Sequence, residues 1–383
     1  MVSALALCAM RMKRGFGIVL GGAVAAGCVA ALAVSAASAG GGGLRAAGGG
    51  PVVARLAANA VAAPAVGNPG GHVAVPAAAQ AVSTSHPNHV IGAGRPAGCT
   101  SAAVVKAVAA GGIITFDCGP KPVTIVMTAT AKVTGAVRRT VLDGGGKVTL
   151  SGGAKIRILS MDTCGDCWEQ QWPQLVVQNL SFVNGYSGVR QTQDGPSDFG
   201  GGAIFDQGGQ LKVVNSSFID NRCYMSGPDL GGGAIRAYGM YMKTPVYITH
   251  DTFTGNSCSN GAALSGLYAN FEVINSLLTN NKATGFGANP ASPGTPGGGS
   301  GGAIYTDGDS YNLTIAGTAM SGNTAPEGGG AIFYVVDGGP GTLRISYSTL
   351  HHNPSGAFQN APGIFSSVDG RDTPPVVVHS TIN

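Results

Sequence analysis

The sequence contains few charged and few aromatic residues, and no acidic residue precedes Asp117. Charged residues make up 10% of the 383 and aromatic residues 6%. Seven of the 22 basic residues precede Asp117, which leaves 15 basic against 18 acidic residues in the remainder. The formal net charge of +4 therefore comes from the N-terminal part, and no nucleic-acid partner is expected.

Several patterns that would indicate helical or catalytic proteins are also missing. No segment of the repeated region holds ten residues of helical periodicity, which excludes helical solenoids. The chain has no Asp-Asp pair, no Gly-His-Gly, no phosphate-binding loop and no nucleophile elbow. Cys164 and Cys167 form a Cys-Gly-Asp-Cys motif, but no second Cys or His pair has zinc spacing, so no metal site is expected.

What the sequence does contain is a pair of alternating motifs. Gly-Gly-Ala-Ile occurs at 201–204, 232–235, 301–304 and 329–332, with a degenerate copy at 261–264. The second motif is an apolar residue, two variable residues and Asn. Its apolar positions recur every 25–42 residues and are Phe182, Phe218, Phe253, Leu278, Met320, Leu350 and Ile382. Two motifs in fixed order at this period indicate a stacked array of repeats.

The residue pattern within each repeat indicates β-strands. Segments such as 211–214, 245–249 and 271–274 alternate apolar and polar residues and are bounded by Gly, Asn, Asp and Ser. Short strands with the same corner chemistry in each repeat predict an all-β, single-stranded parallel β-helix of about nine coils. Stacked Asn side chains would bond to one another, and Asn tolerates the left-handed corner conformation.

The cysteines test this alignment. Cys223 and Cys258 each lie five residues after an aligned Phe, so in-register stacking predicts a disulfide between them. We also predict a Cys99–Cys118 bridge and a local Cys164–Cys167 bridge, with a redox motif as the alternative for the last pair.

The N-terminal part predicts export. Residues 1–39 have a basic start, an apolar run and Ala37-Ser38-Ala39, which is typical of a cleaved signal peptide; an uncleaved membrane anchor is the alternative. Residues 40–95 are rich in Ala, Gly and Pro and predict a disordered linker. The β-helix domain is expected over 96–383. Thr100 can cap a helix over Ser101–Ala110, which we expect to cover the first coil.

The alternating motifs resemble the repeats of the polymorphic outer-membrane protein family, which are adhesin-type right-handed β-helices. This resemblance covers roughly residues 175–383. The upstream segments 113–118 and 141–150 resemble the opening coils of exported, pectate-lyase-like β-helices. The resemblance implies a right-handed helix and a secreted or cell-surface location.

Candidate site residues are few. Asp206, Arg236 and Asp307 follow their Gly-Gly-Ala-Ile motifs closely and are weak candidates for a catalytic role, although their different offsets favour solvated turn residues. Five aromatic residues in or beside long insertions are candidates for stacking on sugar rings: Tyr186, Phe199, Tyr224, Tyr238 and Tyr241.

The expected function is non-catalytic adhesion or recognition, by a monomer, of a polysaccharide or cell-surface ligand. It needs no cofactor and contacts a membrane only through an uncleaved signal segment. The alternatives are a pectate-lyase-like polysaccharide lyase, which would use calcium, and a structural spacer.

Overall fold

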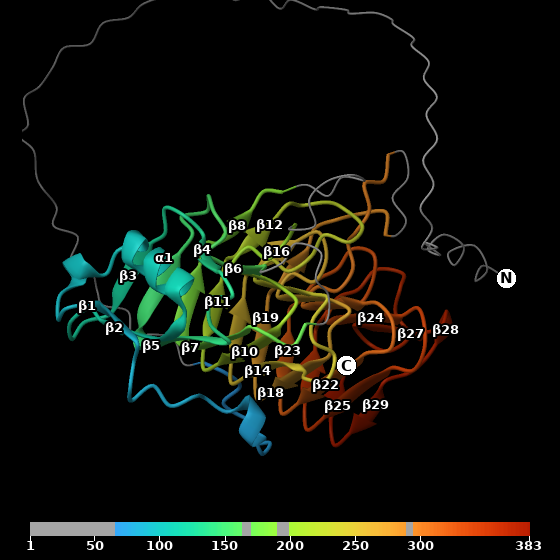
Figure 1. Cartoon of the computed structure of the whole chain (residues 1–383). Helices are drawn as coiled ribbons and strands as arrows, with labels where there is room; N and C mark the ends of the chain where they lie inside the picture. Colours follow the sequence, from blue (N-terminus) through green and yellow to red (C-terminus); the bar gives the residue numbers. More distant parts are fainter. Residues whose placement is uncertain (1–65, 163–169, 190–198, 289–293) are drawn as a thin grey trace, which may run out of the picture. The chain divides into compact units, whose positions relative to one another are not determined.

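The structure is a computed structural model that describes residues 66–162, 170–189, 199–288 and 294–383, which belong to one compact unit, Ala62–Asn383. Nearly all of its regular structure is parallel β-strand, arranged in the described part as three sheets that we name A, B and C. The strands are stacked in chain order, so the colours of Figure 1 run from blue and green near β1 to red near β29. The all-β prediction is confirmed.

Sheet A is the longest of the three sheets. Its strands are β1 (His89–Gly92), β2 (Gly112–Asp117), β3 (Val123–Val126), β5 (Arg139–Ser151), β7 (Gln174–Val183), β10 (Gln210–Val214), β11 (Ser217–Ile219), β14 (Val246–Thr249), β15 (Thr252–Thr254), β18 (Phe271–Ile274), β19 (Leu277–Thr279), β22 (Asn312–Ala316), β23 (Ala319–Ser321), β25 (Thr342–Ser346), β26 (Thr349–His351), β29 (Val376–Val378) and β30 (Thr381–Ile382).

Sheets B and C are built from shorter strands. Sheet B comprises β4 (Ala131–Val133), β6 (Leu159–Asp162), β9 (Ile204–Gln207), β13 (Ile235–Tyr238), β17 (Leu264–Leu267), β21 (Ile304–Asp307), β24 (Ile332–Val336), β27 (Ile364–Val368) and the antiparallel β28 (Arg371–Asp372). Sheet C comprises β8 (Tyr186–Ser187), β12 (Arg222–Cys223), β16 (Ser257–Cys258) and β20 (Lys282–Ala283).

One repeat passes through all three sheets. The chain runs along β10 and β11 in sheet A, turns into β12 in sheet C, continues as β13 in sheet B and returns to sheet A as β14. Each strand pairs in parallel with the equivalent strand of the next repeat, as β10 does with β14 and β13 with β17. The apolar side chains between the sheets form one continuous core.

The predicted alignment of the repeats is confirmed residue by residue. Phe218 pairs with Phe182 on one side and Phe253 on the other, and its ring centroid lies 5.0 Å and 4.7 Å from theirs, with the rings almost parallel. The same register continues through Leu278, Met320, Leu350 and Ile382. Equivalent apolar side chains therefore lie directly over one another inside the stack.

The asparagines of the second motif form a buried ladder. In each step the amide nitrogen Nδ2 donates to Oδ1 of the asparagine in the next repeat: Asn221 to Asn256 (3.1 Å), Asn256 to Asn281 (2.9 Å), Asn281 to Asn323 (2.9 Å) and Asn323 to Asn353 (2.8 Å). The same Oδ1 atoms also accept backbone N–H groups. Each amide is thus satisfied only by its neighbours in the stack.

One detail of the corner prediction is wrong. The left-handed backbone conformation falls on the residue before the ladder asparagine, as at Asp220 (φ 54°), Gly255 (φ 68°) and Asn280 (φ 56°). The ladder asparagine itself keeps ordinary backbone angles, because its role is to bond sideways to the next repeat.

Two of the three predicted disulfides are present. Cys223 and Cys258 are bonded with a Cα–Cα distance of 4.7 Å, and Cys99 and Cys118 with 5.8 Å, both within the range that a disulfide requires. Cys164 and Cys167 lie outside the described residues.

The N-terminal helix is also confirmed. Helix α1 spans Ser101–Ala110, Thr100 Oγ1 accepts the Ala103 N–H at 3.3 Å, and the helix ends at Gly111 with a positive φ of 72°. Its buried face, which includes Val104 and Val108, belongs to the core. Two single-turn 3-10 helices, η1 (Ala77–Ala79) and η2 (Pro96–Gly98), precede it.

The prediction of a disordered linker up to residue 95 is wrong from residue 66 onward. Residues 66–88, here called the strap, run along the outside of sheet A as the blue segment of Figure 1. Side chains of the sheet hold the strap backbone: Gln178 bonds both the N–H and the C=O of Val82 at 2.9 Å, and Asn275 bonds those of Val73 at 3.0 Å and 2.8 Å. Composition could not reveal this, because the partners lie far away in the sequence.

Breaking the ladder should destabilise the stack. Asn256→Ala removes the acceptor of the Asn221 backbone N–H and of one Asn221 Nδ2 hydrogen, while Nδ2 keeps its bond to the Phe182 carbonyl. An unsatisfied buried polar group costs about 1–3 kcal/mol. We expect the free energy of unfolding in urea to fall by that amount. The control is Asn312→Ala, which removes an exposed asparagine side chain of β22. Equal stability of the two variants would contradict the ladder's role.

Candidate functional site

One face of sheet B packs against the core and the other faces outward. Side chains alternate along each strand, so one register column faces the core and the next faces outward. Ile204, Ile235, Leu264, Ile304 and Ile332 pair in the inward column. The outward column pairs Phe205, Arg236, Ser265, Tyr305, Phe333 and Phe365.

Asp206 lies in an inward column and does not join the other two candidates. It pairs with Met161 and Ala237, and both of these residues belong to the core. Its carboxyl is completely buried and has no hydrogen-bond partner among the described residues, and burial raises its pKa well above the ordinary value. Burial therefore favours the protonated form of the Asp206 carboxyl and keeps it out of reach of any ligand.

Arg236 faces outward but is covered. Its side chain is only 1% exposed, Nη1 donates to Ser265 Oγ at 2.8 Å, and its guanidinium lies over the rings of Phe199 (5.4 Å) and Tyr238 (5.8 Å). Burial lowers the pKa of Arg236, while the nearby Asp229 carboxylate raises it. We assign Arg236 a structural role, in which its side chain holds the loops that cover sheet B.

Asp307 is the one weak candidate that lies within a cluster of titratable groups open to solvent. Its carboxyl accepts hydrogen bonds from Tyr305 Oη at 2.9 Å and from the Gly308 N–H at 2.7 Å, and it shares a hydrogen bond with Asp337. Burial, and next the charge of Asp337, raise the pKa of Asp307 to about 7. Near neutral pH the Asp307 carboxyl is therefore partly protonated.

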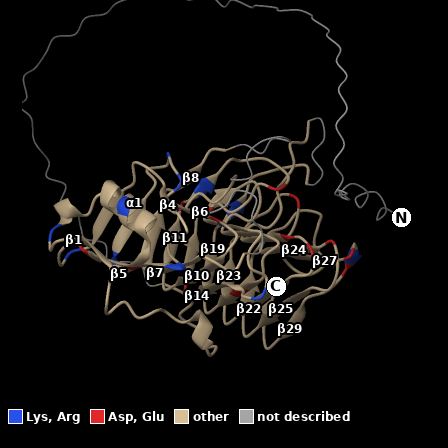
Figure 2. Cartoon of the chain, in the orientation of Figure 1, with Lys and Arg blue, Asp and Glu red and all other residues tan. Residues whose placement is uncertain are grey.

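Tyr268 stands at the centre of this cluster. Burial raises its pKa, and Asp309, Asp307, Tyr238 and Asp337 raise it further, which places all four side chains around it. Tyr238, Tyr268 and Asp307 are half-buried, whereas Asp309 and Asp337 are exposed. We name Tyr238, Tyr268, Asp307, Asp309 and Asp337 the Tyr268 cluster. Figure 2 shows acidic segments beside β24 and β27.

The backbone of Tyr268 is strained. It has a φ of 53°, and the equivalent positions of neighbouring repeats are Gly208 (φ 69°), Gly239 (φ 56°) and Gly308 (φ 129°). The left-handed region costs a residue such as tyrosine about 1–2 kcal/mol, whereas glycine enters it freely. Strain of this kind is characteristic of functional positions.

The five aromatic residues proposed for sugar stacking do not form one surface. Tyr238 lies in the Tyr268 cluster. Phe199 and Tyr224 pack on Leu230 and the Cys223–Cys258 bridge, Tyr186 lies in sheet C, and Tyr241 is half-buried after β13. Sequence reasoning missed Tyr268, Asp309 and Asp337. Aligning the glycine that follows each sheet B strand would have singled out Tyr268.

The cluster does not resemble a calcium site. Within the described ranges, no group of three or more His, Cys, Asp and Glu side chains is arranged to hold a metal ion.

Comparison with known proteins gives no match: no protein-family model matches the chain, and neither does any curated protein or solved structure. The family resemblance therefore depends on the repeat motifs and on the parallel stacking alone. Two disulfides are typical of extracellular proteins. In the part of the chain that is described, no helix has the length and apolarity to cross a bilayer.

The raised pKa of Asp307 predicts a pH dependence of stability. Between about pH 4 and about pH 7 the folded state holds a proton that the unfolded chain has lost, so the free energy of unfolding decreases as the pH rises through this range. Other buried acids add to this slope, so the variant Asp307→Asn isolates the contribution of one residue. We expect a smaller loss of stability between about pH 5 and about pH 8 in this variant, measured by thermal unfolding. An unchanged slope, equal to that of the exposed control Asp117→Asn, would show that Asp307 titrates normally.

Proposed function

We propose that the chain is an exported right-handed parallel β-helix of about nine coils, similar to adhesin-type passengers, and that its Tyr268 cluster recognises an uncharged polysaccharide without transforming it. The observation that carries the proposal is the strained backbone of Tyr268 at a partly exposed position where three neighbouring repeats have glycine. Glycine would occupy this corner without strain, so we assign the tyrosine side chain a role in recognition.

The chemistry of the cluster suits sugar hydroxyls. Phenol and carboxyl groups both accept hydrogen bonds. The phenols also donate, and so does the Asp307 carboxyl when it is protonated. The half-buried rings of Tyr238 and Tyr268 add apolar surface, and such a mixture is typical of small-molecule sites. The three aspartates disfavour a uronic-acid polymer, since like charges repel.

The arrangement supports catalysis poorly. A lyase needs an accessible base, and Arg236 is only 1% exposed. Glycoside hydrolysis uses carboxyl groups about 5–5.5 Å or about 6.5–9.5 Å apart with the sugar between them. Both carboxyl oxygens of Asp307 instead accept hydrogen bonds from the protein, one from Tyr305 Oη and one from the Gly308 N–H.

Replacing Tyr268 by glycine tests the proposal. Tyr268→Gly removes the ring and the strain together, so we expect at least tenfold weaker binding with a thermal midpoint equal to or above that of the wild type. Binding is measured by affinity electrophoresis of the full chain in gels containing β-glucan, xylan or mannan. The control is Tyr241→Ala, outside the cluster.

Two results would count against recognition at this site. Wild-type mobility of Tyr268→Gly in a gel that retards the wild type would locate binding elsewhere. If none of the three polysaccharides retards the wild type, the chain is better explained as a structural spacer.

The lyase alternative predicts a different result. The full chain mixed with polygalacturonate and calcium should produce no rise in the ultraviolet absorbance of unsaturated uronates, because Arg236, the candidate base, is only 1% exposed. A clear rise that disappears with Asp307→Asn would replace recognition by catalysis.

A further inference from the structure

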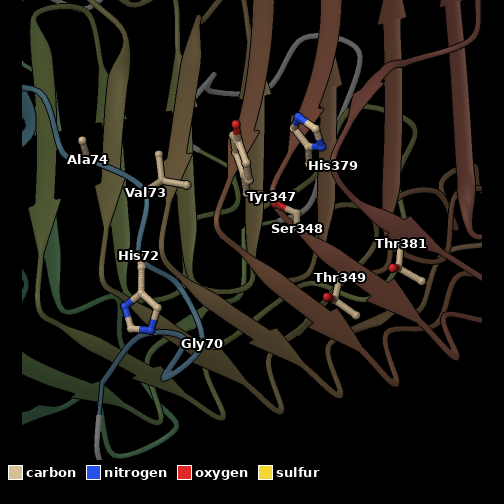
Figure 3. A pocket seen from close by; sticks show the side chains of 9 residues that line it. All are labelled: Gly70, His72, Val73, Ala74, Tyr347, Ser348, Thr349, His379 and Thr381. Carbon is tan, nitrogen blue, oxygen red and sulfur yellow. The ribbon is translucent and has the colours of Figure 1, made fainter.

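A groove of about 550 Å³ lies on sheet A, away from the Tyr268 cluster on sheet B. One wall is the strap and the other is formed by the two C-terminal repeats, as Figure 3 shows. Its lining residues are Gly70, His72, Val73, Ala74, Tyr347, Ser348, Thr349, His379 and Thr381. This volume is within the usual range for small-ligand sites, about 300–1,000 Å³.

The groove exists because the strap stops short of the last repeats. A corner column crosses sheet A where each repeat bends, and it consists of Asn179, Asn215, His250, Asn275, Gly317, Tyr347 and His379, all with positive φ. In the strap, Asn68 bonds the backbone of Asn275 at 2.9 Å and of Gly317 at 2.8 Å, and the chain then turns back. The described part of the strap leaves Tyr347 and His379 exposed.

Tyr347 differs in residue type from the covered positions of the corner column. The covered positions hold asparagine, histidine or glycine, and Asn and Gly adopt the left-handed conformation readily. Tyr347 has the same conformation with a φ of 50°, and its side chain is 59% exposed. Its ring stacks on His379 of the next repeat with centroids 5.1 Å apart. A bulky residue in a strained backbone, exposed beside a groove, points to a ligand.

The lining chemistry defines the class of ligand. No Lys, Arg, Asp or Glu lines the groove, so nothing there complements a charged ligand at neutral pH. The exposed hydroxyls of Thr349 and Thr381 project from adjacent strands, next to the aromatic pair, and the exposed His72 adds a donor and acceptor from the strap. Aromatic surface with hydroxyl and imidazole groups suits the apolar faces and hydroxyls of sugars.

We propose that this groove is a second saccharide site, which binds a short uncharged oligosaccharide across Tyr347 and His379. Strands stack at roughly 4.8 Å. The pair Tyr347–His379 therefore presents an aromatic ring twice along the stack, and the pair Thr349–Thr381 presents a hydroxyl twice, which suits a ligand of repeating units. The site is independent of the Tyr268 cluster and would stand if recognition at that cluster failed.

The test uses saturation-transfer NMR on the full chain. The uncharged probes are maltotriose, xylotriose, mannotriose and N-acetylchitotriose, and trigalacturonate is the charged comparison. Tyr347→Asn is the variant of choice, because asparagine occupies this corner in three earlier repeats and the fold should be retained. We expect at least one uncharged probe to bind, with a dissociation constant raised at least tenfold by Tyr347→Asn and unchanged by Tyr268→Gly.

Four results would overturn the proposal: no transfer from any uncharged probe, wild-type affinity in Tyr347→Asn, equal binding of trigalacturonate, or loss of binding in Tyr268→Gly alone. A lower thermal midpoint of Tyr347→Asn would also contradict it, since Tyr347 would then be a packing residue. Thr381→Val should weaken the same probe without changing the midpoint.

Discussion

Five successive repeats each bury one asparagine amide whose hydrogen bonds come mainly from the neighbouring repeats. Asn256 donates to Asn281 and accepts from Asn221, and all three side chains are completely buried. A repeat shifted by one residue would leave these groups unpaired and would turn its apolar side chains outward. The ladder thus enforces one register, and that register aligns the phenylalanines, the Cys223–Cys258 bridge and the corners.

The same register determines where a side chain can serve a ligand. A corner that must be left-handed is filled at lowest cost by glycine or asparagine, and most repeats follow this rule. Tyr268 and Tyr347 break it, each where the surface is open: one among carboxyls on sheet B and one beside the groove on sheet A. Departures from local preference are expected at functional positions rather than in the repeating core.

The repeat motifs predicted the part of the fold that depends on short-range pattern. The Phe182–Phe218–Phe253 column and helix α1 followed from spacing and capping alone. The strap could not be predicted, because hydrogen bonds from Gln178 and Asn275 order it across about a hundred to two hundred residues of sequence.

The candidate site was only partly predictable, for similar reasons. Asp206 and Asp307 follow their Gly-Gly-Ala-Ile motifs by two and three residues, and this difference of one residue turns the first into the core and the second outward. Asp337 joins Asp307 from the following repeat, beyond the end of β24. Contacts between repeats of unequal length are not visible in a linear motif.

Peptide mapping of the unreduced protein tests in-register stacking most directly. The account predicts one linked peptide pair that contains Cys223 and Cys258 and a second that contains Cys99 and Cys118. Cys223 or Cys258 linked to any other cysteine, or both found as free thiols, would contradict the register on which the stack and both proposed sites depend.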